Sequence, residues 1–247
     1  MLDYEKEAQD YDISRGGEAR AEAAARAVLG LTPPGPGRLL DVGCGTGIVT
    51  RQLAAARPGL RVTGADLTPA MVRMASVRLS GAIVRADSRR LPFRDATFDA
   101  VTTVWLLHLL QDTDVRAVIA ECARVLRPGG VYVTTVDKAA AHNVGSDIDA
   151  VLASRPPSPA RDADGTVRAV AAAHGLTPAG RARFPGRGQG RSPRRTIADL
   201  RRGWFVTLPP GEPRSEEYAA RLAALPDQDR PRPDPEFSLR AFRKPEA

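Results

Sequence analysis

The sequence predicts an α/β fold: a doubly wound, mostly parallel sheet of seven strands with helices on both faces. Three observations indicate it. Short apolar runs alternate with helix-favouring segments, Gly- and Pro-rich breakers separate them, and the alternation completes five rounds by about residue 137. Strands that alternate with helices form a parallel sheet, because each crossover helix returns the chain to the same end of the sheet.

The first elements follow from local composition. An Ala-rich run over 18–30 predicts a helix that ends before a Pro/Gly cluster. A short apolar run over 38–43 predicts a strand buried on both faces, and a helix over 43–56 follows it. The same alternation then predicts a strand over 60–66, a helix from Thr68 to Leu79 and a strand over 82–87.

The remaining elements complete the sheet. A fourth strand is expected over 98–104, and the helix after it places apolar residues from Val115 to Leu126 on one face and ends at RPGG. A fifth strand covers 131–137. Beyond it we expect a loop over 153–162, a helix over 166–175, a sixth strand over 176–184, helices over 196–205 and 215–225, and a closing strand over 236–242.

Length and composition limit the class of protein. The chain has 247 residues, 43% of them apolar and 26% charged, which is typical of one folded domain. No stretch reaches the roughly 18 uncharged apolar residues that a membrane span needs. The first residues are acidic and lack an apolar signal segment. We therefore expect a cytoplasmic protein without a membrane partner.

Cysteine content and charge bear on metals and nucleic acids. Two cysteines, Cys44 and Cys122, are too few for a structural zinc site or a disulfide framework, so no metal is expected. The net charge is +7, and the most basic stretch, 181–202, holds eight Arg against one acid, Asp199. Few aromatic residues accompany it, so stacking platforms for bases are poorly represented and a nucleic-acid partner is not expected. We interpret the stretch as a solvated face first, and as a surface for an anionic substrate or RNA second.

The residues that carry chemistry fall where strands of the predicted sheet end. In an open parallel sheet, ligands bind outside the carboxyl ends of the strands. The segment Asp41-Val42-Gly43-Cys44-Gly45-Thr46-Gly47 follows the first strand and opens a helix. Its glycines permit a sharp turn and close approach of a ligand to the backbone. Free amides at that helix start favour a carboxylate or another electron-rich group.

Two acids follow at the ends of the next two strands. Asp66 lies 19 residues after the glycine segment, where its carboxylate can accept both hydroxyls of a ribose. Asp87 ends the third strand, where it can accept from an adenine amino group while Ser88 offers its amide. Leu67 and Met71 can then cover the purine. This arrangement predicts a site for an adenosyl compound.

The order of the motifs discriminates between classes of nucleotide-binding protein. The glycine segment reads GCGTG, not the GxGxxG spacing of dinucleotide enzymes. The segments LLDVGCGTG, VTGADLTPAMVRMA, ADSRRLPF, FDAVTTVWLLHLLQD and RVLRPGGVYVTT resemble, in this order, the motifs of class I S-adenosylmethionine-dependent methyltransferases. The resemblance covers about residues 38–136 and is nearest to the methyltransferase type 11 subgroup, which includes ubiquinone and menaquinone biosynthesis enzymes.

This resemblance implies a Rossmann-like fold and S-adenosyl-L-methionine as cofactor, with S-adenosyl-L-homocysteine as product. It implies that Gly43, Cys44 and Gly45 line the methionine part of the cofactor. Val104 would lie beneath the cofactor after the fourth strand, and Tyr11, in YDISRGG, resembles an N-terminal YD segment that closes over the site. The complete set of expected cofactor residues is Tyr11, Gly43, Cys44, Gly45, Asp66, Leu67, Met71, Asp87, Ser88 and Val104.

Catalysis of methyl transfer requires the acceptor to be held in line with the methyl group while water is excluded. An acceptor hydroxyl or acidic carbon also benefits from a general base, and histidine suits neutral pH. His108 follows the fourth strand, where many relatives have a His-rich segment; here the next position is Leu109. His142 lies in the loop after the fifth strand. Both are candidate catalytic bases, with a structural histidine as the alternative reading for each.

The leading hypothesis is a single methyltransferase domain over 1–247 that methylates an oxygen, nitrogen or carbon of a small-molecule metabolite. Its expected parts are an N-terminal helical cover over 1–37, a cofactor-binding core over 38–137, and a substrate-side insert with closing strands over 138–247. The positive charge suggests an RNA or protein methyltransferase as an alternative, and the altered His segment suggests a non-catalytic cofactor-binding protein. The glycine segment followed by an acid leaves a nicotinamide oxidoreductase as a further alternative. The acceptor and the oligomeric state are not specified by these residues.

Overall fold

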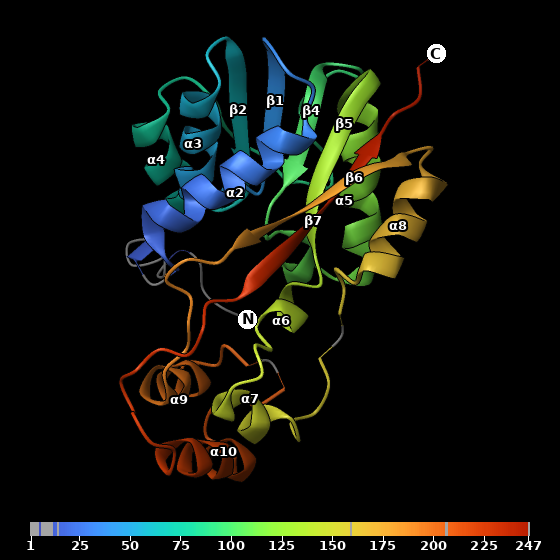
Figure 1. The fold of residues 1–247 in the computed structure, drawn as a ribbon. Coiled ribbons are helices and arrows are strands. Elements are labelled where there is room, and N and C mark those ends of the chain that lie inside the picture. The colour runs from blue at the N-terminus through green and yellow to red at the C-terminus, as the bar shows by residue number, and fades with distance from the viewer. Residues whose placement is uncertain (1–4, 6–11, 14, 159, 206, 247) are drawn as a thin grey trace.

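Figure 1 shows the computed structural model, which describes residues 5, 12, 13, 15–158, 160–205 and 207–246. Seven strands form one sheet in the order β3-β2-β1-β4-β5-β7-β6. The neighbours from β3 to β5 pair in parallel, whereas β7 runs antiparallel to both β5 and β6. The strands are β1 (Gly37–Val42), β2 (Leu60–Asp66), β3 (Ile83–Arg85), β4 (Phe98–Thr103), β5 (Leu126–Val136), β6 (Thr177–Pro185) and β7 (Glu236–Arg243). The expected Rossmann-like α/β fold with a mostly parallel, seven-stranded sheet is confirmed.

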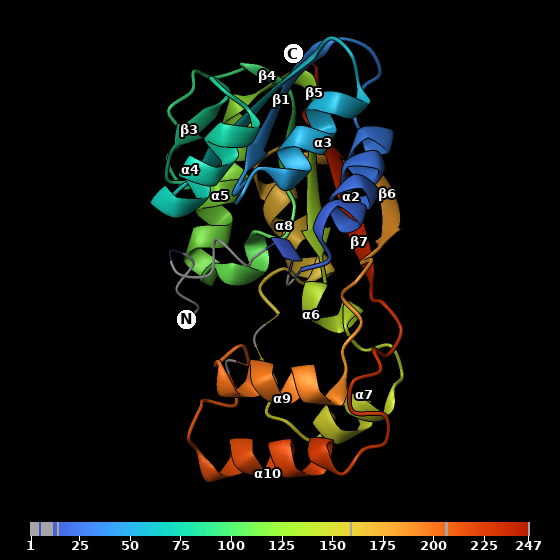
Figure 2. The ribbon, with the colours of Figure 1, turned by 90° about the vertical axis from the view of Figure 1, so that its left-hand side faces the viewer.

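Helices cover both faces of the sheet (Figure 2). On one face, α2 (Gly17–Leu31) and α3 (Ile48–Ala56) bury a core that includes Leu39 of β1. On the other face, α5 (Asp112–Val125) and α8 (Asp164–Ala173) bury a core that includes Leu40. Successive strand side chains point to opposite faces, so an apolar strand such as β1 supplies both cores. The described residues include no helix that is long and apolar enough to cross a bilayer.

The direction in which strands are added reverses at β1. The chain places β2 and β3 on one side of β1, with α4 (Pro69–Arg78) between them in sequence, and then returns to place β4 on the other side. The loops after β1 and β4 therefore diverge. Such a switch point forms the crevice in which open α/β sheets bind ligands. The expected site residues that follow β1, β2, β3 and β4 all belong to this edge of the sheet.

A small helical layer lies beyond the carboxyl ends of the parallel strands. It consists of α7 (Asp147–Leu152), α9 (Pro193–Arg201) and α10 (Pro213–Ala223), which we call the cap. The short helix α6 (Lys138–Ala141) follows β5 and leads toward it (Figure 1). The cap has an apolar core of its own, made of Ile148, Val151, Leu152, Leu200, Leu208, Tyr218 and Leu222.

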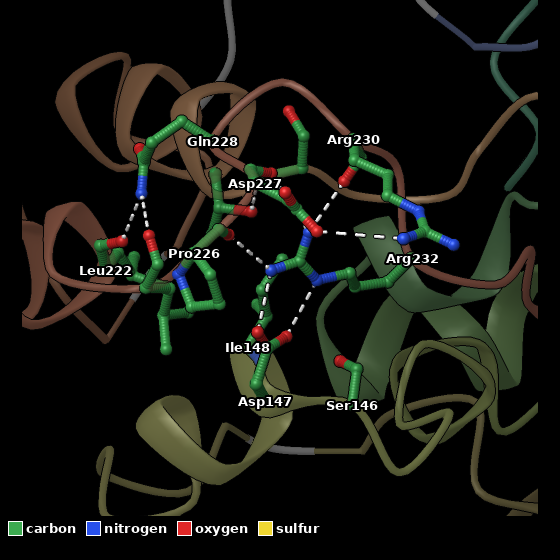
Figure 3. Close-up of polar contacts among 12 residues, drawn as sticks. Ser146, Asp147, Ile148, Leu222, Pro226, Asp227, Gln228, Arg230 and Arg232 are labelled. Carbon is green, nitrogen blue, oxygen red and sulfur yellow. Dashed lines mark hydrogen bonds and ion pairs between the residues drawn. The ribbon is translucent and has the colours of Figure 1, made fainter.

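Arg232 ties the cap together (Figure 3). Its guanidinium donates to both oxygens of Asp147 at the start of α7, with N···O distances of 2.7 and 2.6 Å. It also donates to the backbone carbonyls of Pro226, Asp227 and Arg230. Only 12% of the Arg232 side chain is exposed. One side chain therefore fixes the segment between α10 and β7 against α7.

Replacing Arg232 by alanine is expected to loosen the cap and to leave the sheet intact. The Asp147 side chain is 37% exposed, so solvent screening limits the expected loss of stability to about 1 to 2 kcal/mol. Hydrogen–deuterium exchange should rise in α7 and in 226–232 but not in β1 or β4. Arg230→Ala is the matched control, because its side chain is 78% exposed, and it should leave exchange unchanged. Equal exchange in the Arg232 variant and the wild type would contradict this role.

Several element boundaries differ from the sequence prediction, and two of the differences affect how the elements begin or end. α5 ends at Val125 and β5 already begins at Leu126, so the RPGG segment lies within the strand instead of ending the helix. α9 begins at Pro193, three residues before the expected start. Its N-cap is Ser192, whose hydroxyl accepts from the Arg195 amide at 3.3 Å, and Ser followed by Pro is a recognised helix start.

Candidate active site

Three glycines shape the loop after β1. Gly43, Gly45 and Gly47 have positive φ angles of 72°, 55° and 76°, which residues with a Cβ rarely adopt. A Cβ on Gly43 would lie 2.8 Å from the Leu106 side chain, and one on Gly47 would lie 2.9 Å from Ala75 of α4. Glycine is therefore required here both for the turn and for close packing. The loop passes directly against the segment that follows β4.

The amides of this loop are hydrogen-bonded within the protein. Those of Gly43 and Cys44 donate to the Ala65 carbonyl at 2.8 and 3.1 Å. The Gly45 amide donates to Asp66 Oδ2 at 2.9 Å. These three amides are therefore not free to donate to a ligand carboxylate, contrary to the prediction from the sequence for this loop. A ligand at this edge would contact the surface of the loop and the Asp66 carboxylate.

Asp66 is fixed at the end of β2 by two backbone amides. Its Oδ2 accepts from Gly45 and its Oδ1 from Thr68, each at 2.9 Å. Since each carboxylate oxygen has two lone pairs, both oxygens can still accept a hydroxyl. The adjacent Leu67 side chain is 55% exposed, whereas Met71 is buried among the side chains of α4. Of the two residues expected to cover a purine, Leu67 is open to a ligand and Met71 is packed into the protein.

Asp87 and Ser88 lie at the same edge, one strand further out. Asp66 pairs with Arg85 in the register of β2 and β3, so Asp87 follows two residues beyond that pair. Its carboxylate accepts from the Arg89 side chain at 2.7 to 3.1 Å and from the Arg89 amide at 2.9 Å. These hydrogen bonds hold the pKa of Asp87 below its ordinary value. Asp87 is therefore an ionised acceptor that Arg89 already orients, with its remaining lone pairs available to a ligand.

Two buried groups support the loop from within. Asp41 of β1 accepts from the Thr50 hydroxyl at 2.7 Å. Burial raises the pKa of Asp41 from 3.8 to about 7; the Thr50 hydrogen bond opposes this shift, and the Asp66 charge adds to it. The Cys44 sulfur packs against Gly64 of β2, where a Cβ would come within 2.9 Å of it. Burial raises the pKa of the Cys44 thiol as well, so this cysteine is a packing residue and not a nucleophile.

The N-terminal segment is anchored to the same loop. The expected site residue Tyr11 lies outside the described residues. Its neighbour Asp12 accepts from the Thr46 hydroxyl at 2.7 Å and from Arg78 of α4 at 2.6 Å. Glu5 accepts from an amide in the first turn of α4 at 2.9 Å. Asp12 is therefore held beside the loop after β1, and Glu5 beside the start of α4.

Replacing Asp12 by alanine should release this segment. The Asp12 side chain is 12% exposed and its partner Arg78 is 25% exposed, so the lost charge-assisted hydrogen bonds should cost about 2 kcal/mol. Limited proteolysis within 1–16 should accelerate, and the affinity for the expected cofactor should fall roughly tenfold. Glu18→Ala, which removes an exposed ion pair with Arg51, is the control. Unchanged proteolysis of the Asp12 variant would show that the segment is held by other contacts.

The turn after β4 places Leu106 against the glycine loop. Trp105 has a φ of 57°, which is unusual for a bulky residue, and its amide donates to the Thr135 hydroxyl at 2.8 Å. Backbone strain of this kind persists where the surrounding structure enforces it, often at functional sites. The expected residue Val104 is buried in the core, and Leu106 makes the contact with Gly43. Nothing in the sequence marks Leu106, because its position depends on the left-handed turn at Trp105.

Both candidate histidines are half-buried near the ends of β4 and β5. His108 is in the short helix η1 (Leu107–Leu109), and His142 follows α6. Burial, together with the positive charges of Lys138 and Arg15, lowers the pKa of both imidazoles. His108 Nδ1 and His142 Nε2 are buried and have no hydrogen-bond partner among the residues described. The structure therefore brings together two neutral imidazoles, the protonation state that a general base needs.

Comparison with known proteins identifies the class of domain. Residues 40–134 match the model of a family described as a methyltransferase domain. The ubiquinone/menaquinone biosynthesis C-methyltransferase of Desulfotalea psychrophila is 39% identical over 100 residues, which are 39% of this chain and 40% of that protein. The ubiquinone biosynthesis O-methyltransferase of Xanthomonas oryzae pv. oryzae is 36% identical over 108 residues, or 41% of this chain and 44% of that protein. The chain thus spans less than half the length of these two curated relatives.

Similarity in fold extends further than similarity in sequence. The crystal structure of the cyclase SpnF has a TM-score of 0.63 to this chain at 21% identity and covers 99% of this chain and 94% of that chain. A likeness at this identity shows the fold alone, and one fold hosts several reactions. The sequence match over 40–134, by contrast, includes the glycine loop and the acids at the ends of β2 and β3. Residues 40–134 are therefore similar in sequence to a methyltransferase domain, and the fold of the whole chain resembles that of SpnF.

Proposed function

We propose that the chain is an enzyme that transfers a methyl group from S-adenosyl-L-methionine to an oxygen, nitrogen or carbon atom of a small molecule. The observation that supports this most is the setting of Asp66. Its carboxylate is held by the amides of Gly45 and Thr68, and the exposed apolar side chain of Leu67 lies next to it. An oriented carboxylate beside an open apolar residue suits a ribose joined to a purine.

The residues at this edge fit an adenosyl amino acid. Asp66 would accept from the ribose hydroxyls, and Asp87 with Ser88 would bind the adenine. Gly43, which has no room for a Cβ, would let the amino-acid part lie against the backbone. When bound, the cofactor supplies a methyl group that is already electrophilic, so the protein needs no nucleophile of its own. The further contacts in this proposal are Tyr11, Gly45 and Leu67, while Cys44, Met71 and Val104 would support them from within the protein.

The protein would contribute proton removal and exclusion of water. His108 and His142 are the proposed bases for an acceptor that loses a proton, because both are neutral and both lie near the strand ends that face the cap. The cap lies beyond these strand ends (Figure 1). An acceptor between the cap and the sheet would be shielded from solvent.

The placement of the Arg-rich stretch favours a small acceptor over RNA. Three of its exposed arginines form ion pairs, which are Arg183–Glu236, Arg194–Asp229 and Arg201–Glu216. Most of the affinity for nucleic acid comes from counterions that are released when protein cations neutralise phosphates. A cation that already has an acidic partner contributes less to this release. Arg191, in contrast, is half-buried at the cap. The eight arginines therefore do not form one open basic surface.

Binding and turnover test this proposal. S-adenosylmethionine and S-adenosylhomocysteine should raise the melting temperature in a saturable way, and NAD at the same concentrations should not. A labelled methyl group should then be found on at least one member of a panel of small hydroxylated, amino or quinone compounds. Absence of the thermal shift would overturn the proposal. A shift without transfer to any acceptor would favour the non-catalytic alternative instead.

A further inference from the structure

Two half-buried cations lie where the cap meets the sheet. Lys138 begins α6 directly after β5, and Arg191 precedes α9 in the cap. Burial lowers the pKa of Lys138 from 10.5 to about 7 and that of Arg191 from 12.5 to about 10, and the charge of Arg15 adds to both shifts. Within the described ranges, neither side chain has a carboxylate at salt-bridge distance. Cations withdrawn from solvent usually have a counter-charge, so this pair indicates a site for an anion.

A cavity opens beside Arg191. It is a shallow hollow whose enclosed part holds about one water-sized group, and it is lined by residues from 142–149, 189–191 and 232–235. Gln189 in its wall is only 7% exposed. The Nε2 atoms of Gln189 and His142, which both line the cavity, are buried and lack a hydrogen-bond partner among the residues that the structure describes. Buried polar atoms are nearly always paired, so a cluster of exceptions indicates groups that complete their hydrogen bonds with a ligand.

Two indole N–H groups converge on the same region. Trp105 and His142 both pack on Phe237, with ring centres 5.4 and 5.6 Å from it. Trp204, after α9, stacks with the Arg15 guanidinium 3.5 Å from its ring centre, and the Arg15 charge acts on His142. Both indole Nε1 atoms are buried and have no partner among the described residues. Two further donors without a partner therefore lie at the ends of β4 and α9, one beside Phe237 and one beside Arg15.

The nearest acids are engaged in other contacts. Asp149 is part of the capping box that starts α7, and Asp162 accepts from the Lys138 amide at 2.9 Å. Asp199 lies within electrostatic range of Arg191, but burial raises its pKa. These carboxylates moderate the positive charge of the region without forming a salt bridge to either cation.

We propose that this cavity binds an anionic oxygen group of the methyl acceptor, a phosphate or a carboxylate, through Arg191, with Gln189 and His142 as hydrogen-bonding partners and the nearby charge of Lys138 adding to the attraction. The inference rests on the proposed methyl-transfer function and names its substrate class. A guanidinium pairs with two oxygens of such a group at once. The acceptor would be held at its charged end by the cap while its reacting atom lies toward the ends of β1 and β4.

The position of the cavity separates this anion from the carboxylate of the cofactor. None of the cavity's lining residues belongs to the glycine loop, β1 or β2. The glycine loop follows β1, whereas Lys138 follows β5, which is two strands away in the sheet. At about 4.8 Å per strand, this separation is about 10 Å. The methionine carboxylate, at the loop after β1, is therefore a different group from the one assigned here.

Anion titrations of the full chain saturated with S-adenosylhomocysteine test this inference. The probes are inorganic phosphate, pyrophosphate and acetate, each compared with potassium chloride at equal ionic strength by thermal shift and calorimetry. At least one probe should stabilise the wild type in a saturable way. Arg191→Gln and Lys138→Met should each weaken that binding at least tenfold. The matched control is Arg194→Gln, three residues along, whose side chain is 68% exposed and paired with Asp229; it should bind the probe as the wild type does.

The outcomes separate this inference from the proposed function. No saturable response to any probe, or an unchanged response in both the Arg191 and the Lys138 variants, would overturn the inference while leaving cofactor binding intact. Competition between the probe and S-adenosylhomocysteine would also overturn it, because the cavity would then hold the methionine carboxylate. Failure of S-adenosylhomocysteine to bind at all would overturn the proposed function, and with it the assignment of the anion to an acceptor. Independent binding of both ligands would support the inference.

Discussion

Replacing Asp66 by alanine is expected to lower the affinity for S-adenosylhomocysteine by at least about 100-fold. The carboxylate would accept from two ribose hydroxyls, and each charge-assisted hydrogen bond contributes on the order of 1.5 to 3 kcal/mol. The same carboxylate also holds the amides of Gly45 and Thr68, so its removal should disorder the loop as well. Titration calorimetry with the purified full chain measures the effect.

Two further variants test whether the loss of affinity in Asp66→Ala is specific to the Asp66 carboxylate. Asp66→Asn keeps an acceptor for one amide but removes the charge, so it should fold normally and lose about tenfold in affinity. Asp95→Ala removes an acid that is 79% exposed and is paired only with Arg124 among the salt bridges of the described residues; its affinity should equal that of the wild type. Wild-type affinity in Asp66→Ala would exclude Asp66 as the ribose ligand.

Asp41→Asn is expected to change the pH dependence of stability. The pKa of Asp41 is raised from 3.8 to about 7 by burial, so the folded state binds more protons than the unfolded state between these values. Stability of the wild type should therefore fall as pH rises through this window. An asparagine does not titrate, so the difference in unfolding free energy between variant and wild type should move in favour of the variant by about 3 kcal/mol from pH 5 to pH 8. Urea titrations at several pH values measure it.

The neighbouring hydroxyl provides the complementary variant. Thr50 donates to Asp41 and opposes the rise of its pKa, so Thr50→Val should destabilise the protein more at pH 8 than at pH 5. A constant difference between Asp41→Asn and the wild type across the pH range would show that the Asp41 carboxyl titrates at an ordinary pKa in the folded protein. In that case Asp41 would not contribute to the pH dependence of the unfolding free energy.

The parallel half of the fold could be predicted from the sequence because its signals are local. Each strand of that half is a short apolar run bounded by Gly, Pro or Asp, and the helix after β1 begins at a glycine loop whose conformation requires glycine. The acids at the ends of β2 and β3 were predicted at one edge of the sheet, and the register of the two strands places them there. Their contacts with a cofactor stay a prediction.

The other features of the structure could not be predicted, because they depend on contacts between residues that are far apart in the sequence or on very short helices. Arg191 belongs to an Arg-rich stretch that reads as a solvated face, and only the packing of the cap against the sheet removes part of it from solvent. Leu106 meets Gly43 because Trp105 adopts a left-handed conformation, which residue type does not indicate. The four-residue helix α6 and the six-residue helix α7 are too short for a periodic apolar pattern to identify them.

A crystal structure of the full chain with S-adenosylhomocysteine tests the central claim most directly. We predict that the ribose hydroxyls lie within hydrogen-bonding distance of Asp66, that the adenine lies beside Leu67 and Asp87, and that the amino-acid part runs along the loop from Gly43 to Gly47. An adenosyl group bound elsewhere, or one that contacts neither Asp66 nor Asp87, would contradict the account.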